Sequence, residues 1–179
     1  MAAAKHIGIV LFPDVEELDA VGPWEVLAAW TRSFPDDGYT VSCLSRFGGL
    51  VQCAKGLALQ AHYSFADVPK LEVLVYPGGQ GTRSQLQDRD TLDWVRRQRA
   101  DVPLMTSVCT GSLVYAAAGL LSLSMSVITA GKVCIGLVLK GAIRTSALRG
   151  TSRTHRYHPF VTLARRLTAN VTNARSRGS

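Results

Sequence analysis

The sequence predicts an α/β fold built on one doubly wound, mostly parallel sheet. Two observations predict it. Over the first two thirds of the chain, short apolar runs typical of buried strands alternate with segments of helical spacing. Strands joined through helices pair in parallel, and ligands of such sheets bind at the carboxyl ends of the strands. At 179 residues the chain is long enough for one such domain with a buried core.

The first predicted unit is a strand, a loop and a helix. Residues 5–12 are apolar enough for a buried strand, and the polar residues 13–17 form the loop. Pro23 suits the first turn of a helix, where its missing N–H costs nothing, and Trp24 and Leu27 continue at helical spacing.

The middle of the chain reads as strands and turns. We expect a strand at 39–44, a turn at Gly48-Gly49 and a short strand at 57–61 that belongs to a β excursion. Residues 72–76 form another buried strand, which ends at the turn Pro77-Gly78-Gly79.

The last predicted unit surrounds Cys109. A helix at 86–99 turns Leu92 and Val95 inward, and its arginines form a solvated face. A buried strand at 102–106 and a helix at 110–121 place Cys109 at the turn between them. Because that helix is apolar all round, we expect it to be deeply buried.

A cysteine at the start of a helix is favourably placed for nucleophilic chemistry. The unpaired N–H groups and the positive end of the helix dipole favour a thiolate and can hold a developing negative charge. Gly111 permits close backbone approach, as in the nucleophile elbows of other α/β enzymes. The alternative is a buried structural thiol.

Asp19 is the candidate proton carrier for this cysteine. No histidine stands in a recognisable partner position, which argues against a Cys-His triad. A carboxyl group beside an apolar pocket and a thiolate has its pKa pushed upward and can carry a proton near neutrality. The alternative role of Asp19 is to cap the helix that Pro23 starts.

The other cysteines give little support for a metal or a disulfide. Cys43, Cys53, Cys109 and Cys134 show no CxxC pair or other ligand spacing, so we expect no metal site. Cys43 is best explained as a small core residue. A bridge between Cys43 and Cys53 is left open.

The charge of the chain divides at residue 121. Residues 1–121 hold ten basic and all thirteen acidic residues, whereas residues 122–179 hold ten basic residues and no acidic one. We therefore expect a domain at 1–121 and an atypical basic segment at 122–179, partly disordered. No recognition helix accompanies the basic segment, which argues against nucleic acid as a partner.

The N-terminal end of the sequence predicts no association with a membrane. The residues Met1-Ala2-Ala3-Ala4-Lys5 lack the features of a secretory signal, and no apolar run reaches the roughly 20 residues of a membrane span. We expect a cytoplasmic location and no membrane partner.

Three motifs resemble a known family. They are GIVLFPDVEELDAVGPWEVL at 8–27, VLVYPGGQGTRS at 73–84 and LMTSVCTGSLVYAAAGLL at 104–121. In this order and at these separations they resemble the DJ-1/PfpI superfamily, and most closely its isonitrile hydratase branch. The resemblance covers about residues 5–121. It implies a flavodoxin-like, class I glutamine amidotransferase-like sandwich, a homodimer, a small-molecule substrate and no cofactor.

The resemblance also implies an activity and its residues. Members of the branch are lyases that add water to an isonitrile to give an N-substituted formamide. By the motifs, Cys109 is the nucleophile, Asp19 handles the proton and Thr110 helps to orient substrate or water. Gly78 and Gly79 line the substrate site, and the N–H groups of Gly79 and Thr110 form the charge-stabilising pocket.

Alternatives remain for the site and for the function. Glu25 could face the thiol instead of Asp19, although it lies a turn into the helix. A redox or stress sensor that oxidises its cysteine, or a glyoxalase-like enzyme, fits the same superfamily. The later family motifs are replaced after Leu121, so we expect a sandwich that is incomplete at its C-terminal part, through a deletion or an altered reading frame.

Overall fold

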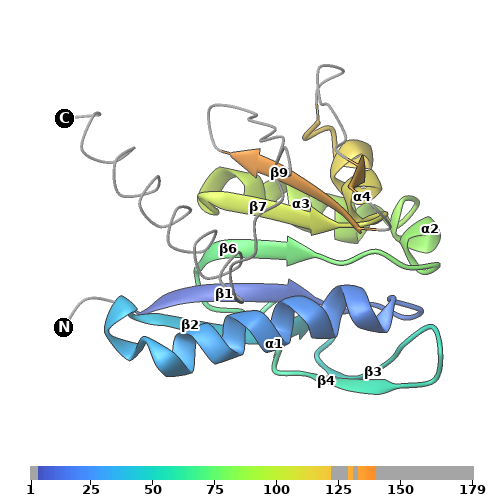
Figure 1. The fold of residues 1–179 in the computed structure, drawn as a ribbon. Helices are drawn as coiled ribbons and strands as arrows, with labels where there is room; N and C mark the ends of the chain where they lie inside the picture. The colour runs from blue at the N-terminus through green and yellow to red at the C-terminus, as the bar shows by residue number, and fades with distance from the viewer. Residues whose placement is uncertain (1–3, 122–128, 131–132, 140–179) are drawn as a thin grey trace. The chain divides into compact units, whose positions relative to one another are not determined.

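The computed structural model describes residues 4–121, 129–130 and 133–139 of the chain. The described strands and helices are organised about one central sheet (Figure 1). The strands are β1 (Lys5–Val10), β2 (Tyr39–Ser45), β3 (Gly49–Gln52), β4 (Ala58–Ala61), β5 (Tyr63–Ser64), β6 (Leu71–Tyr76), β7 (Leu104–Val108), β8 (Thr129–Ala130) and β9 (Val133–Leu139). The helices are α1 (Glu17–Ser33), the 3-10 turn η1 (Pro35–Asp37), α2 (Thr82–Gln85), α3 (Arg89–Asp101) and α4 (Gly111–Ala117).

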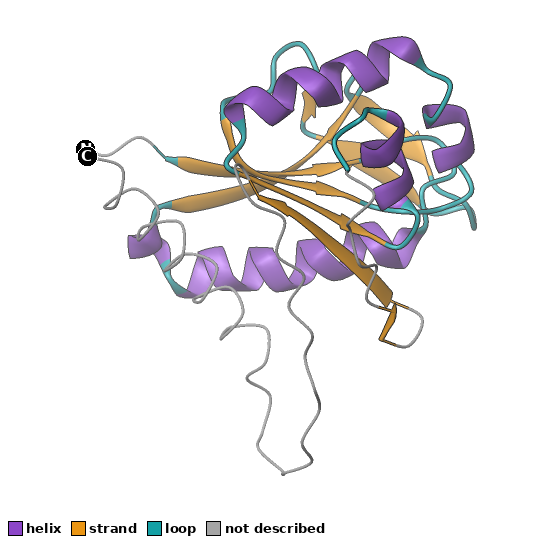
Figure 2. Cartoon of the chain, turned by 90° about the horizontal axis from the view of Figure 1, so that it is seen from above, coloured by secondary structure: helices purple, strands orange, loops and turns teal. Residues whose placement is uncertain are grey.

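The sheet is mostly parallel, as the sequence predicts. Its seven strands lie in the order β5-β2-β1-β6-β7-β9-β8. β1 pairs in parallel with β2 and β6, β6 with β7, and β2 with β5, whereas β9 pairs antiparallel with β7 and β8. α1 covers one face of the sheet and α3 the other (Figure 2). This is the flavodoxin-like arrangement, and β3 and β4 form a separate hairpin beside it.

The central strands form the core because they are apolar on both faces. Ile7, Ile9 and Val10 of β1 are at most 1% exposed, and Leu74 of β6 is fully buried. A continuous apolar strand of this kind needs helices on both faces of the sheet. The loops that lead to the functional residues begin where these buried strands end.

The predicted start of the first helix is wrong. α1 begins at Glu17, and Pro23 lies inside it. Proline within a helix removes the hydrogen bond to the carbonyl four residues earlier, here that of Asp19, and it clashes with the Cβ of the preceding residue. That preceding residue is Gly22, which has no Cβ, so part of the clash is absent.

The segment after β6 differs from the prediction in its boundaries. The predicted helix at 86–99 is α3, which begins later, at Arg89, because Asp88 caps its start by accepting hydrogen bonds from the N–H groups of Asp90 and Thr91. A separate short helix, α2, precedes it. Leu92 and Val95 are buried, as expected. The strand predicted at 102–106 is β7 and begins two residues later, because Val102 still ends α3.

α4 is shorter and less buried than the sequence predicts. It ends at Ala117, where Gly119 takes a left-handed conformation and the N–H of Leu120 reaches the carbonyl of Tyr115. The prediction of burial all round is wrong, since Leu113 is 48% exposed while Val114 is fully buried. One face of α4 packs on the sheet and the other does not.

The buried thiols behave as core residues. Cys43 is 8% exposed, and burial raises its pKa to about 12. Cys43 and Cys53 are both free, so the bridge left open by the sequence is not formed. The predicted basic segment 122–179 lies outside the described residues apart from β8 and β9. In the described part of the chain, no helix is both long enough and apolar enough to cross a bilayer.

Candidate active site at the carboxyl end of the sheet

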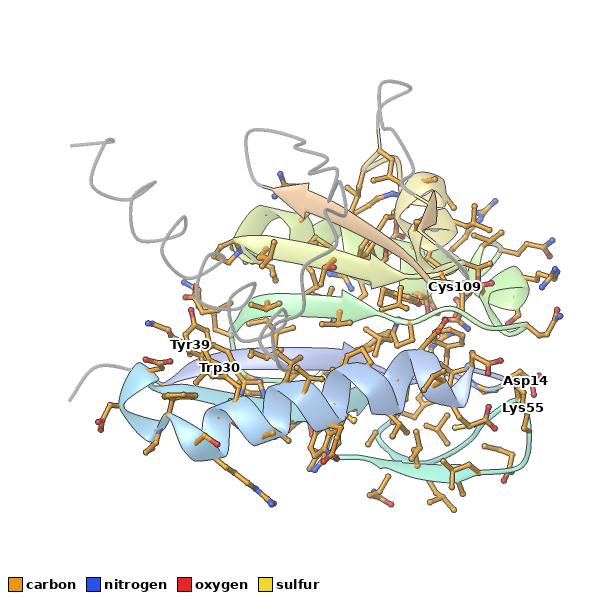
Figure 3. All side chains as sticks on the ribbon, viewed as in Figure 1. Asp14, Trp30, Tyr39, Lys55 and Cys109 are labelled. Atoms are coloured by element: carbon orange, nitrogen blue, oxygen red, sulfur yellow. The ribbon has the colours of Figure 1, made fainter. Side chains whose placement is uncertain are left out.

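Three loops meet where β1, β6 and β7 end. The N–H of Glu16 donates to the carbonyl of Gly78 at 2.9 Å, and Val15 forms an isolated bridge with Gly79. The N–H of Gly79 in turn donates to Oγ1 of Thr110 at 3.0 Å. Figure 3 places Cys109 at this end of the strands. The convergence expected from the parallel sheet is therefore present.

Cys109 occupies the turn between β7 and α4 in a strained conformation. Its φ is 51°, in the left-handed region that non-glycine residues rarely adopt. The turn can be this sharp because Gly111 follows: a Cβ there would lie 2.1 Å from the carbonyl oxygen of Tyr76. The side chain of Cys109 is neither fully buried nor fully exposed. This is the geometry of a nucleophile elbow.

Asp19 is the carboxyl group that the fold brings to Cys109. Its Oδ2 accepts the N–H of Gly78 at 3.2 Å, and its side chain is hydrogen-bonded with that of Cys109. Burial raises the pKa of Asp19, while the hydrogen bonds with Gly78 and Cys109 oppose that rise. Because α1 begins at Glu17, Asp19 lies in the first turn and is not the helix cap.

Glu25 does not share this position. It is exposed on α1, six residues beyond Asp19, and among the described residues no hydrogen bond or ion pair joins it to Cys109. The carboxyl group that the structure pairs with the thiol is therefore that of Asp19.

Gly78 and Gly79 shape the backbone between the two side chains. A Cβ on Gly78 would lie 2.8 Å from Oδ2 of Asp19 and 2.7 Å from the backbone N of Thr110. Gly79 has a φ of 131°, which other residues rarely adopt. In this conformation the N–H of Gly79 is bonded to Thr110, so the pocket predicted from the N–H groups of Gly79 and Thr110 has one of its donors engaged.

Contacts that the sequence did not predict hold the loop that leads into α1 and Asp19. The turn between β3 and β4 reaches this loop: the N–H of Ala54 donates to the carbonyl of Val15, and Nζ of Lys55 contacts the carboxylates of Glu16 and Glu17. Figure 3 shows Lys55 at the same end of the sheet as Cys109. No sequence pattern indicates that this turn folds back onto the first loop.

The histidines of the described chain lie away from the thiol. Nδ1 and Nε2 of His6 contact the hydroxyl groups of Thr40 and Ser42, and His62 accepts a hydrogen bond from the N–H of Cys43. His155 and His158 lie outside the described residues. Across residues 4–121 and the short strands beyond, no three His, Cys, Asp or Glu side chains are placed to hold a metal ion.

The arrangement places a thiol, a carboxyl group and backbone donors around one point. The thiol can attack an electrophilic carbon, and the hydrogen-bonded carboxyl group can give or take the proton. The hydroxyl of Thr110, the residue after Cys109, is a polar group that could orient a small molecule, and it accepts the N–H of Gly79 at 3.0 Å. The site has the components of covalent catalysis by an α/β enzyme.

Known proteins resemble this chain in sequence or in fold. The chain is 44% identical over 118 residues to an isonitrile hydratase of Pseudomonas putida, covering 66% of this chain and 49% of that protein. A ThiJ/PfpI family protein of Pseudomonas syringae superposes with a TM-score of 0.60 at 30% identity, covering 66% of this chain and 48% of that one. Oxidized DJ-1 of Toxoplasma gondii shares the fold, with a TM-score of 0.53 at 18% identity and coverage of 65% and 62%.

The family follows from these matches and from the site. The chain spans about half the length of the Pseudomonas putida relative. The pattern that defines the DJ-1/PfpI family matches residues 5–141, which include β1, the cysteine elbow and β9. The chain belongs to the DJ-1/PfpI family.

Proposed function

We propose that the protein is an isonitrile hydratase, a lyase in which Cys109 attacks the terminal carbon of an isonitrile. The observation that carries the proposal is the placement of the Asp19 carboxyl group, held by the N–H of Gly78, at the cysteine elbow where the carboxyl ends of the strands meet. The Pseudomonas putida relative, which bears that name, supports the choice of substrate.

The reaction divides into two steps in which the atoms balance. The sulfur of Cys109 bonds to the isonitrile carbon while the proton shared with Asp19 passes to the same carbon, which gives a thioimidate. Water then adds to that carbon, one of its protons passes to nitrogen and the other to Asp19, and the carbon–sulfur bond breaks. The product is an N-substituted formamide, and Cys109 and Asp19 again share one proton.

The raised pKa of Asp19 suits this role. A general acid works best when its pKa lies near the working pH, and burial moves the carboxyl group in that direction. Thr110, the residue after Cys109, orients the substrate or the attacking water, and Gly78 and Gly79 line the space where the substrate binds. The proposal uses no cofactor and includes the homodimer and the cytoplasmic location that the resemblance implies.

The test is formation of a formamide from cyclohexyl isocyanide, with small aldehydes assayed in parallel. We expect turnover of the isonitrile and a loss of at least about 10³-fold in Cys109→Ala. Turnover of the aldehydes alone would assign the protein to a glyoxalase-like activity. Full activity in Cys109→Ala would end the proposed mechanism.

Two carboxyl variants on one helix identify the proton carrier. Asp19→Asn keeps an acceptor for the N–H of Gly78 but cannot carry the proton, so we expect kcat to fall by about 10²-fold or more. Glu25→Gln, on the exposed face of the same helix, is expected to retain the wild-type rate. The opposite result would assign the proton to Glu25.

A redox sensor is the second candidate, because the thiol of Cys109 is partly accessible at the elbow. Mild peroxide followed by peptide mass spectrometry separates it from the enzyme. Sulfinate confined to Cys109, without isonitrile turnover, favours the sensor. Turnover by the untreated protein that is lost on oxidation favours the hydratase.

A further inference from the structure

A second threonine lies behind the site and contacts Thr110. Thr82, at the start of α2, is 1% exposed. Its hydroxyl group donates to the carbonyl of Gly79 at 2.7 Å and lies 3.3 Å from the hydroxyl of Thr110. Thr110 in turn accepts the N–H of Gly79 at 3.0 Å. The hydroxyl groups of Thr82 and Thr110 and the backbone of Gly79 therefore all contact one another.

The number of available protons limits the directions of these hydrogen bonds. A threonine hydroxyl has one proton to donate and two lone pairs to accept with. The short contact assigns the proton of Thr82 to the carbonyl of Gly79. The proton of Thr110 then has two acceptors, each at 3.3 Å: the oxygen of Thr82 and the carbonyl of Gly79. The result is a ring of contacts in which the N–H of Gly79 donates to Thr110, and both hydroxyl groups donate to partners within the ring.

A purely local role for Thr82 explains only part of this geometry. Threonine hydroxyls often bond to a carbonyl three residues earlier, and the contact with Gly79 has that spacing. The contact with Thr110 comes from another loop and does not follow from the local turn. Because Thr82 is buried, water is not at hand to replace its hydroxyl group, and its loss leaves buried polar groups unsatisfied.

The ring determines what the active site offers to a ligand. While it is closed, the hydroxyl of Thr110 contacts Thr82 and the carbonyl of Gly79, and the N–H of Gly79 is held by Thr110. A substrate that bonds to the Thr110 oxygen, or to the N–H of Gly79, competes with these internal bonds. The orientation of Thr110 therefore depends on a residue that does not touch the substrate.

We propose that Thr82 is a positioning residue, which through its hydroxyl sets the orientation of Thr110 and of the Gly79 N–H in the active site. This proposal deepens the proposed hydratase function and rests on it for its kinetic readout. It also predicts a property of the free protein that does not depend on turnover.

The kinetic test removes only the hydroxyl group. Thr82→Val keeps the volume, and we expect kcat for isonitrile hydration to fall about tenfold with KM changed less than about twofold, because misorientation affects the reacting geometry more than binding. Thr82→Ser restores the hydroxyl and is expected to return kcat to within about twofold of wild type. Thr91→Val is the matched control, since Thr91 is equally buried and its hydroxyl bonds to Asp88, away from the site.

The second test follows hydrogen exchange of the Gly79 amide by NMR in the ligand-free protein. We expect exchange at Gly79 to accelerate about tenfold or more in Thr82→Val and in Thr110→Val, which opens the ring from the other side, and to stay at the wild-type rate in Thr82→Ser and Thr91→Val. Unchanged exchange at Gly79 in both valine variants would overturn the proposal, and so would a Thr82→Ser variant as impaired as Thr82→Val.

The two readouts separate this proposal from the proposed function. If the wild type forms no formamide, the hydratase function fails, and the exchange of Gly79 alone decides the role of Thr82. If the wild type turns over and Thr82→Val keeps its full kcat, the hydratase stands and the positioning role falls. If Thr82→Val does not fold, the exchange rate of the Gly79 amide in Thr110→Val and in Thr82→Ser decides the role of the ring instead.

Discussion

Asp19 combines a proposed chemical role with a cost to folding. Burial raises its pKa, so the folded protein holds the Asp19 proton more tightly than the unfolded chain does. By linkage, the stability that this carboxyl contributes is fully present below its unfolded pKa, about 3.9, and is lost as the pH rises through the folded pKa. Groups placed for chemistry often reduce stability in this way.

Asp19→Asn should therefore be more stable than the wild type at neutral pH. Asparagine carries no charge to desolvate, so its advantage appears as the pH rises above about 4 and levels off above the folded pKa. We expect a gain of about 2 °C in Tm at pH 7 and none at pH 3, measured by thermal unfolding. An Asp19→Asn variant that is less stable at pH 7 would contradict the assigned environment.

The residues differ in how far the sequence could predict them. Cys109 and Asp19 follow the ends of buried strands, and a parallel sheet brings such residues to one edge, so pattern alone predicted their proximity. Thr82 also follows a strand end, but its contact with Thr110 depends on the path of two glycine-rich loops. Lys55 could not be found, because no local signal indicates that the turn at Lys55 reaches α1.

At the scale of elements, the elbow depends on the close approach of α4 to the end of β6. Gly111 has no room for a side chain, since a Cβ would lie 2.1 Å from the carbonyl oxygen of Tyr76 and 2.6 Å from that of Pro77. Both contacts are to backbone, which cannot move aside as a flexible side chain can. The position of Cys109 therefore depends on the residue two places after it.

Gly111→Ala should disrupt the elbow. We expect a loss of about 3 kcal/mol or more in the free energy of unfolding, together with loss of isonitrile turnover, measured by urea unfolding and by the formamide assay. Gly119→Ala is the matched control, because Gly119 has a φ of 74° but nothing within 4 Å of the added Cβ. It should lose only the backbone cost of about 1 kcal/mol and remain active. Equal losses of unfolding free energy and of turnover in the two variants would contradict the role assigned to the close approach of α4 to the end of β6.

The boundaries of elements were less predictable than their order. Pro23 was a misleading signal, because Gly22 before it lets the helix continue through the proline. The helix predicted at 86–99 begins only at Arg89, because the carboxylate of Asp88 caps α3. A glycine before the proline and a capping carboxylate before α3 decided these two cases, and hydrophobic spacing alone does not report such local features.

At the scale of the whole molecule, one family pattern accounts for the sheet and the site. It extends from β1 to β9, and all the described strands except the β3–β4 hairpin form one seven-stranded sheet. The antiparallel pairing of β9 with β7 places β9 beside the strand that leads into the elbow. The apolar run at 133–139 was visible in the sequence, but its partner was not, because strand pairing between distant segments leaves no local pattern.

The central claim is that the sulfur of Cys109 carries out the hydration, and titration with iodoacetamide tests it most directly. Peptide mass spectrometry measures the alkylated fraction of each cysteine, while the formamide assay measures the remaining activity. Cys43 and Cys53 are buried, and the high pKa of Cys43 keeps its thiol protonated, so Cys109 should react before them. We predict that isonitrile turnover falls in proportion to alkylation of Cys109 and reaches zero when that residue is fully modified. Turnover that persists with Cys109 fully alkylated would contradict the account.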